Sequence, residues 1–142
     1  MELDNSFPDL LPEEREALRD AADVVTYPSG AEVIVQGEKV KRLLVIRSGM
    51  VRVTQAYLDD LIAEFVGPLG PGDVVGEMSF IDGENASATL VADGDVEAFA
   101  ISHEVLDGMS AADAAFTGRF YRSLFLDVAR RLRKTNLRVV PQ

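Results

Sequence analysis

The stretch that decides the fold is LGPGDVVGEMSFIDGENASATLVAD, residues 69–93. It opens inside a dense turn region, residues 67–73, which holds three glycines and two prolines. It closes with a short run, residues 87–92, whose threonine, leucine and valine favour a strand. Because glycine and proline interrupt regular structure, the stretch predicts short strands separated by turns.

The same alternation of short runs and turns extends outward over residues 24–102. Asp59-Asp60 and Asp93-Gly94-Asp95 are typical of hairpin tips between neighbouring runs. Many short strands at this spacing predict a β-sandwich or β-barrel over about 24–102. The strand candidates are residues 24–27, 31–35, 43–47, 50–56, 61–66, 87–92 and 96–101.

Helices are predicted on both sides of the strands. Pro12 suits the first position of a helix over about 12–22, and the glutamates that follow it favour the positive end of that helix. Ser102 is a typical cap for a short helix that begins at His103. A longer helix is expected from about 112 to 138, with a length of about 40 Å.

The long helix carries two apolar stripes, and one small barrel rarely buries both faces of such a helix. Phe116, Phe120 and Leu124 step by four residues. The second stripe steps by four and three, as in a coiled-coil seam, and consists of Tyr121, Phe125, Val128, Leu132, Thr135 and Val139. We expect the first stripe to cover the barrel and the second to pack against another copy, giving a homodimer. The residues expected at this dimer helix are Tyr121, Phe125, Val128 and Leu132. The alternative is that both stripes pack within one chain.

Composition excludes several classes of function. The chain of 142 residues suits a single domain over 1–142, and it has no cysteine and one histidine, His103. That excludes a disulfide scaffold, a thiol nucleophile, an iron–sulfur cluster and a multi-histidine metal site, and so argues against a metal enzyme of the cupin type. We predict no enzymatic activity. No stretch approaches about 18 apolar residues and the start, MELDNSF, is acidic, so we expect no membrane segment and a cytoplasmic location.

Charge is distributed unevenly along the chain. The net charge is −10, yet seven of the 14 basic residues lie in residues 119–138, and none lies between Arg52 and Arg119. One interpretation is a solvated acidic body with a basic helix. The other is that the basic segment touches an acidic partner or the acidic body of its own chain.

The ordered glycines give the sequence a family resemblance. The segments YPSGAEVIVQGE at 27–38 and LLVIRSGMVRV at 43–53, followed by the stretch at 69–93, resemble the cyclic nucleotide-binding domain family. That family includes catabolite activators, protein kinase A regulatory subunits and cyclic-nucleotide-gated channels. The resemblance covers about residues 7–135. It implies a mainly β fold: a double-stranded β-helix, or jelly roll, of eight strands, with an N-terminal helix and two C-terminal helices over about 103–138. The glycines expected at its corners are Gly30, Gly37, Gly49, Gly72 and Gly76.

Within this resemblance, Gly76 to Thr89 corresponds to the phosphate-binding cassette. The family pattern implies a strand that ends at Gly76 and a short helix that begins at Glu77. The carboxylate of Glu77 would accept a hydrogen bond from a ribose hydroxyl, and an arginine nine residues later would pair with the cyclic phosphate. Here that position is Ala86. The candidate ligand-binding residues are Gly76, Glu77, Met78, Ser79, Ala86, Ser87, Ala88 and Thr89.

We therefore expect a regulatory or sensor module with a degenerate cassette. Losing two charge-assisted hydrogen bonds weakens binding by roughly two to four orders of magnitude, so tight binding of cyclic AMP or cyclic GMP is not expected. Glu77 then either accepts a ligand hydroxyl or stabilises its own helix. No cofactor is assigned; a cyclic nucleotide or another small ligand stays open as the occupant, and so does a protein effector.

Two alternatives remain. In the first, the domain binds cyclic nucleotides and Arg52, Arg119 or Arg122 holds the phosphate from outside the cassette. In the second, the chain is the sensor part of a transcription regulator like the catabolite activators. DNA binding by this chain itself is not expected, because only about four residues follow the long helix and a helix-turn-helix needs far more.

Overall fold

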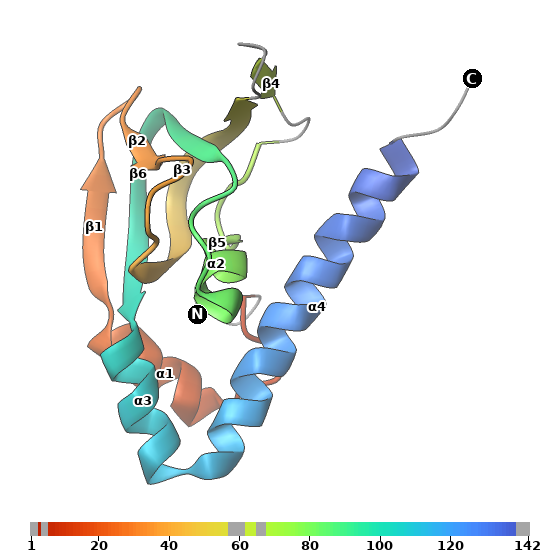
Figure 1. Cartoon of the computed structure of the whole chain (residues 1–142). Coiled ribbons are helices and arrows are strands. Elements are labelled where there is room, and N and C mark those ends of the chain that lie inside the picture. Colours follow the sequence, from red (N-terminus) through yellow and green to blue (C-terminus); the bar gives the residue numbers. More distant parts are fainter. Residues whose placement is uncertain (1–2, 4–5, 57–61, 65–67, 139–142) are drawn as a thin grey trace.

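The computed structural model describes residues 3, 6–56, 62–64 and 68–138, with no side chains for 62–64 and 134–138. In Figure 1, a β-roll stands above two helices at one end, and the last helix runs diagonally past the roll to the C-terminus. The expected hairpin tip at Asp59-Asp60 lies outside the described residues, as do the side chain of Thr135 and all of Val139.

The strands form one antiparallel arrangement. The order of the sheet is β1-β6-β3-β4, with β2 added to β6 and β5 added to β3. Every pairing is antiparallel, which confirms the predicted β-roll. The strands of the described residues are β1 (Asp23–Tyr27), β2 (Glu32–Ile34), β3 (Arg42–Ala56), β4 (Ile62–Glu64), β5 (Val74–Val75) and β6 (Thr89–Ser102).

The predicted hairpin at Asp93-Gly94-Asp95 is wrong. These residues lie inside the single long strand β6, which stays paired with β3 on both sides of them. Ser48 faces Glu97 and Met50 faces Asp93, so the extra residues of β6 form a bulge at a corner of the roll. Because β3 and β6 each continue through that corner, the described residues form six strands where the resemblance implies eight.

Gly49 shows why that corner needs glycine. Its φ is +91°, and a Cβ at this position would collide with the carbonyl oxygen of Asp95. A side chain would therefore be strained in its backbone conformation and blocked by the opposite strand. The two long strands approach each other closely here because Gly49 has no side chain.

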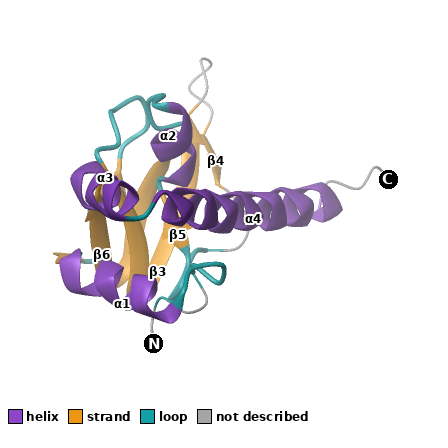
Figure 2. Cartoon of the chain, turned by 90° about the horizontal axis from the view of Figure 1, so that it is seen from below, coloured by secondary structure: helices purple, strands orange, loops and turns teal. Residues whose placement is uncertain are grey.

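Four helices lie at one end and along one side of the roll in the described part of the chain (Figures 1 and 2): α1 (Pro12–Ala21), α2 (Glu77–Asp82), α3 (His103–Ala112) and α4 (Ala114–Arg138). The Ser102 hydroxyl accepts a hydrogen bond from the Val105 amide at 3.2 Å, as predicted for a cap. The Asp113 carboxylate accepts one from the Ala115 amide at 3.0 Å. This second cap separates α3 from α4, so the long helix begins two residues later than expected.

Two apolar cores hold these layers together. One lies inside the roll, around Ile46, Val51 and Val75. The other lies where the helices meet the sheet, and it contains the first stripe of α4: Phe116, Phe120 and Leu124 are 2% exposed or less. The ring of Phe7, from the segment before α1, stacks on Phe120 with centroids 5.3 Å apart. The first stripe therefore covers the body, as predicted.

The second stripe of α4 is divided between two environments. Phe125 and Leu132 are 57% and 58% exposed. Tyr121, in contrast, packs on the core of its own chain, and Val128 is half-buried beside a pocket described below. Tyr121 and Val128 are therefore partly covered by their own chain, while the predicted dimer seam of all four residues stays a prediction. The helix turns these two toward the body.

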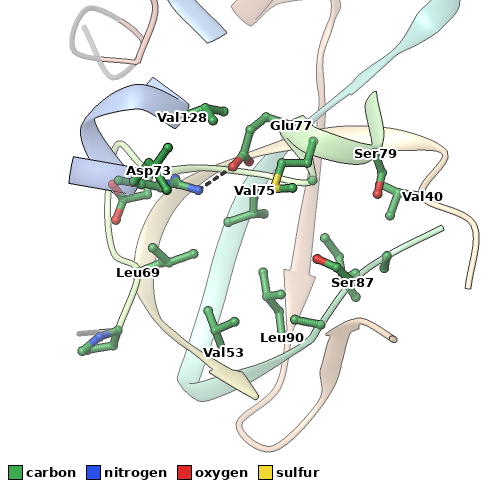
Figure 3. A pocket seen from close by; sticks show the side chains of 18 of the residues that line it. Val40, Val53, Leu69, Asp73, Val75, Glu77, Ser79, Ser87, Leu90 and Val128 are labelled. Atoms are coloured by element: carbon green, nitrogen blue, oxygen red, sulfur yellow. Dashed lines mark hydrogen bonds and ion pairs between the residues drawn. The ribbon is translucent and has the colours of Figure 1, made fainter. Parts of the chain in front are cut away.

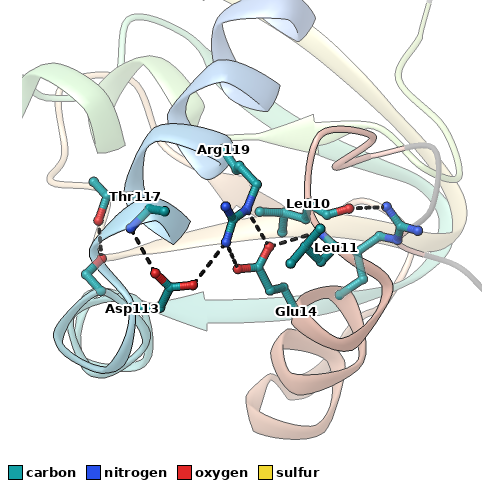
Figure 4. A network of polar contacts seen from close by, with 9 residues as sticks. Leu10, Leu11, Glu14, Asp113, Thr117 and Arg119 are labelled. Carbon is teal, nitrogen blue, oxygen red and sulfur yellow. Dashed lines mark hydrogen bonds and ion pairs between the residues drawn. The ribbon is translucent and has the colours of Figure 1, made fainter.

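The basic segment touches the acidic body of its own chain (Figure 4). Arg119 of α4 donates two hydrogen bonds to Glu14 of α1, at 2.9 and 2.6 Å, and a third to Asp113 at 3.2 Å. Glu14 also accepts a hydrogen bond from the Leu11 amide at 2.8 Å, which fixes the start of α1. The hydrogen bonds from Arg119 lower the pKa of the Glu14 carboxyl. This contact joins the N-terminal helix to the long helix.

Candidate ligand pocket

A cavity of about 590 Å³ opens between the β-roll, α2 and α4 (Figure 3). Its walls include all but one of the residues predicted from the cassette: Gly76, Glu77, Met78, Ser79, Ala86, Ser87 and Ala88. Thr89 is the exception, since its hydroxyl accepts a hydrogen bond from the Gln36 amide at 2.9 Å and ties β2 to β6. A volume of this size is typical of small-molecule sites.

The turn before α2 brings Glu77 into this cavity. Gly76 has a φ of +84°, and a Cβ there would lie 3.1 Å from the side chain of Val40. The chain therefore turns sharply after β5 and starts α2 at once. Phe80 anchors the other side of α2 in the core, where its ring stacks on His103 at 3.9 Å. His103 begins α3, as predicted, and takes part in packing.

Glu77 binds an arginine of α4. The residue is buried, and its carboxylate accepts a hydrogen bond from Arg131 Nη1 at 2.8 Å. Arg131 Nη2 donates to the Val74 carbonyl and lies 3.2 Å from Asp127 Oδ2. Burial raises the pKa of the Glu77 carboxyl, and the positive charge of Arg131 offsets only part of that rise. Of the two roles that the sequence left open for Glu77, neither includes this pairing.

A second arginine lies beside the first. Arg130 lines the cavity and donates to Asp127 Oδ1 at 2.6 Å, while the Asp73 carboxylate, also in the wall, accepts from the Gly70 amide at 2.7 Å. Arg130 and Arg131 are the cations of the described lining. Three carboxylates, those of Asp73, Glu77 and Asp127, lie in or next to it. Negative charges at this site therefore outnumber the positive ones.

The three arginines that the first alternative named as substitutes for the cassette arginine lie elsewhere. Arg52 is 4.0 Å from Asp93, Arg119 binds Glu14, and Arg122 is 3.5 Å from Asp9. None of the three lines the cavity. The alternative that one of them holds a phosphate at this site is not supported, because Arg52 lies beside Asp93, while Arg119 and Arg122 contact carboxylates of the N-terminal segment. The unequal charge of residues 119–138 was the signal that could have drawn attention to Arg130 and Arg131.

Ala86 stands in the wall where the resemblance implies an arginine. It is 8% exposed, its amide donates to the Glu38 carbonyl at 2.9 Å, and its carbonyl accepts from the Gly37 amide at 2.8 Å. Position 86 is therefore held firmly against the loop after β2. The wall around it is apolar and includes Ile34, Val40, Val53, Leu69 and Leu90.

The fold, the glycine corners and a pocket at the cassette can now be compared with known proteins. The family model described as the cyclic nucleotide-binding domain matches residues 24–113. The chain belongs to this family.

Relatives within the family are bacterial regulators. The cyclic AMP receptor protein of Thermus thermophilus is 34% identical over 98 residues, which are 69% of this chain and 45% of that protein. The CRP-like cAMP-activated global transcriptional regulator of Mycobacterium tuberculosis is 29% identical over 120 residues, or 84% of this chain and 51% of that protein. The chain thus spans about half the length of these curated relatives.

Solved structures agree with the family fold. The crystal structure of the Thermus thermophilus catabolite activator protein superposes with a TM-score of 0.79 at 30% identity, over 95% of this chain and 61% of that one. The N-terminal domain of a transcriptional regulator from Streptomyces coelicolor gives 0.76 at 28% identity, over 97% and 92%. The cyclic nucleotide-binding fold predicted from the sequence is confirmed. In the described residues, no helix is both long and apolar enough to cross a membrane.

Proposed function

We propose that this domain is a non-enzymatic sensor module whose pocket does not bind cyclic AMP or cyclic GMP at micromolar concentrations. The observation that carries the proposal is Ala86, an apolar residue at the position where the family resemblance implies a phosphate-binding arginine. Two charge-assisted hydrogen bonds are lost with that arginine. At about 1.5–3 kcal/mol each, their loss lowers affinity by roughly two to four orders of magnitude.

The arginines of α4 do not replace the missing one. Arg131 is bound to Glu77, to the Val74 carbonyl and to Asp127, and Arg130 is bound to Asp127. A cyclic phosphate could recruit Arg131 only by leaving the buried carboxylate of Glu77 without its partner. A buried charge without a partner is costly, so this exchange opposes phosphate binding.

A thermal-shift experiment tests the proposal with cyclic AMP and cyclic GMP. A ligand present at about a hundred times its Kd stabilises a protein by about 2.7 kcal/mol, a change that the midpoint of thermal unfolding reports readily. We expect no shift for the natural sequence and a clear shift for Ala86→Arg. Asn85→Arg is the matched control, because it adds the same charge at the exposed neighbouring position outside the cavity wall.

Two results would contradict the proposal. A shift in the natural sequence would show that the pocket binds the nucleotide without the cassette arginine. Equal responses of Ala86→Arg and Asn85→Arg would show that general electrostatics, and not a phosphate site at position 86, governs binding.

We propose a more specific setting for this sensor: the sensor part of a homodimeric transcription regulator in the cytoplasm. The Mycobacterium tuberculosis relative is named as a transcriptional regulator, and both curated relatives are about twice as long as the matched segment. In this setting the exposed residues of α4 join two copies. The chain alone is expected to bind duplex DNA only weakly and without sequence preference, because its basic residues supply phosphate contacts alone. Filter binding measures this: DNA duplexes of different sequence should bind equally weakly at low salt, and raised salt should abolish the binding of all of them.

A further inference from the structure

Resting on the proposed function, we infer that the pocket takes an uncharged, mainly apolar small molecule and binds it with the Glu77–Arg131 ion pair intact. The wall that the roll contributes to the cavity is apolar. From one side of the cavity to the other it presents aliphatic side chains, in Ile34, Val40, Val53, Leu69, Val75 and Leu90. Contact with such a wall releases water from an apolar ligand and gives nothing to a charged one.

The arginines at the site already have carboxylate partners. Arg131 contacts Glu77, Val74 and Asp127, and Arg130 contacts Asp127. An anionic ligand must compete with Glu77 or Asp127 for these guanidinium groups, and a cationic ligand must displace Arg131 from Glu77. A neutral ligand requires neither exchange. Figure 3 shows the Glu77–Arg131 contact at one side of the cavity, with Val53 and Leu90 on the other.

Two hydroxyl groups also belong to the lining. The side chains of Ser79 and Ser87 line the cavity from α2 and from the loop before β6. Their backbone carbonyls accept hydrogen bonds from the Gly83 amide and from the Gln55 side chain, respectively. A hydroxyl donates to or accepts from a neutral polar group, so these two serines suit an alcohol, carbonyl or amide on an otherwise apolar body.

Two apolar side chains of the lining are open to solvent. Met78 of α2 and Leu132 of α4 both line the cavity and are 55% and 58% exposed. An apolar ligand that covers such side chains removes their surface from water. An apolar ligand in the cavity would cover these two side chains, whereas a charged ligand would place its charge next to apolar surface.

Three probes with the same bicyclic body test the inference: naphthalenemethanol, naphthoate and naphthylmethylammonium. Calorimetric titration of the natural chain should show binding of the alcohol, with both ions at least about tenfold weaker, which is about 1.4 kcal/mol. Met78→Arg adds a cation at an exposed position of the lining and should raise the affinity for naphthoate at least about tenfold. Val24→Arg is its control, since Val24 is 53% exposed and lies outside the cavity wall.

The outcomes separate this inference from the proposed function. Naphthoate binding as tightly as the alcohol would overturn the inference, because it would show that an arginine is available to an anion. Failure of all three probes to bind would overturn it as well. Neither result bears on cyclic nucleotides, which are titrated separately, and binding of cyclic AMP would overturn the proposed function whatever the three probes do.

Discussion

Arg131 of α4 and Glu77 of α2, 54 residues apart in the sequence, meet at the edge of the pocket with Nη1 2.8 Å from Oε1. The side chain of Glu77 is 8% exposed and that of Arg131 is 26% exposed, so the contact is largely shielded from water. It joins the segment that resembles a phosphate-binding cassette to the helix with the exposed apolar residues. A substitution of Glu77 is therefore expected to alter the position of α4 at Arg131, and a substitution of Arg131 to alter the position of α2 at Glu77.

Replacing Arg131 should destabilise the domain. Arg131→Met leaves the buried Glu77 carboxylate without its partner, and we expect a loss of about 1–3 kcal/mol in the free energy of unfolding, measured by urea denaturation. The double variant Glu77→Gln, Arg131→Met should recover most of this loss, because it removes the orphaned charge. Arg130→Met is the control, since Arg130 is 59% exposed at its side chain. Equal losses in Arg131→Met and Arg130→Met would contradict the importance of the pair.

The Glu14–Arg119 contact should make stability depend on pH. Arg119 holds the pKa of Glu14 below its ordinary value of 4.5, so the folded state releases the proton more readily than the unfolded chain. The stabilisation is therefore fully present above the ordinary pKa and is lost as the pH falls through the lowered value.

This dependence is measured by comparing the natural chain with Glu14→Gln in urea denaturation at neutral pH and at successively lower pH. The difference in stability between the two should be largest at neutral pH and should shrink on acidification. Glu13→Gln, at an exposed neighbouring position, should differ little from the natural chain at any pH. A difference between the natural chain and Glu14→Gln that grows on acidification would contradict the sign.

Alanine at two glycines of the same corner should have unequal effects. Gly94 has a φ of +82° with open space around it, so Gly94→Ala should cost about 1 kcal/mol from backbone strain alone. Gly49→Ala adds a collision with the Asp95 carbonyl and should cost at least about 3 kcal/mol. Thermal and urea unfolding measure both. Similar losses in the two variants would show that the strands can separate at Gly49 without cost.

The exposed part of α4 should hold two copies together. Phe125 and Leu132 leave large apolar surfaces in water, and covering them against the same helix of a second chain would remove that cost. Phe125→Asp with Leu132→Asp should give a monomer in light scattering at tens of micromolar, where the natural chain is expected to be a dimer. Val24→Asp should leave the dimer unchanged. A natural chain that is monomeric at that concentration would contradict the prediction.

The residues of the cassette could be located from the sequence because they are close together in it. Gly76, Glu77 and Ser87 lie within one stretch, and the turn glycines fix where that stretch bends. Ile34 and Val53 come to the same cavity from two other segments. No local pattern marks them, since their place depends on the pairing of β2, β3 and β6.

The errors have physical reasons as well. Asp93-Gly94-Asp95 has the composition of a hairpin tip, yet β6 remains paired with β3 on both sides of it, so the same residues form a bulge. The charge count located the basic segment on α4 but did not reveal which carboxylate it meets. Arg131 reaches Glu77 because the chain changes direction at Asp113, between α3 and α4, so that α4 runs past α2.

Calorimetric titration of the unaltered chain with cyclic AMP tests most directly the claim that this cyclic nucleotide-binding fold lacks its usual phosphate partner. We predict no saturable heat up to hundreds of micromolar, because Ala86 supplies no charge and Arg131 remains bound to Glu77. Saturable binding with a low-micromolar Kd would contradict the claim and would show that an arginine of α4 leaves its carboxylate partner for the phosphate.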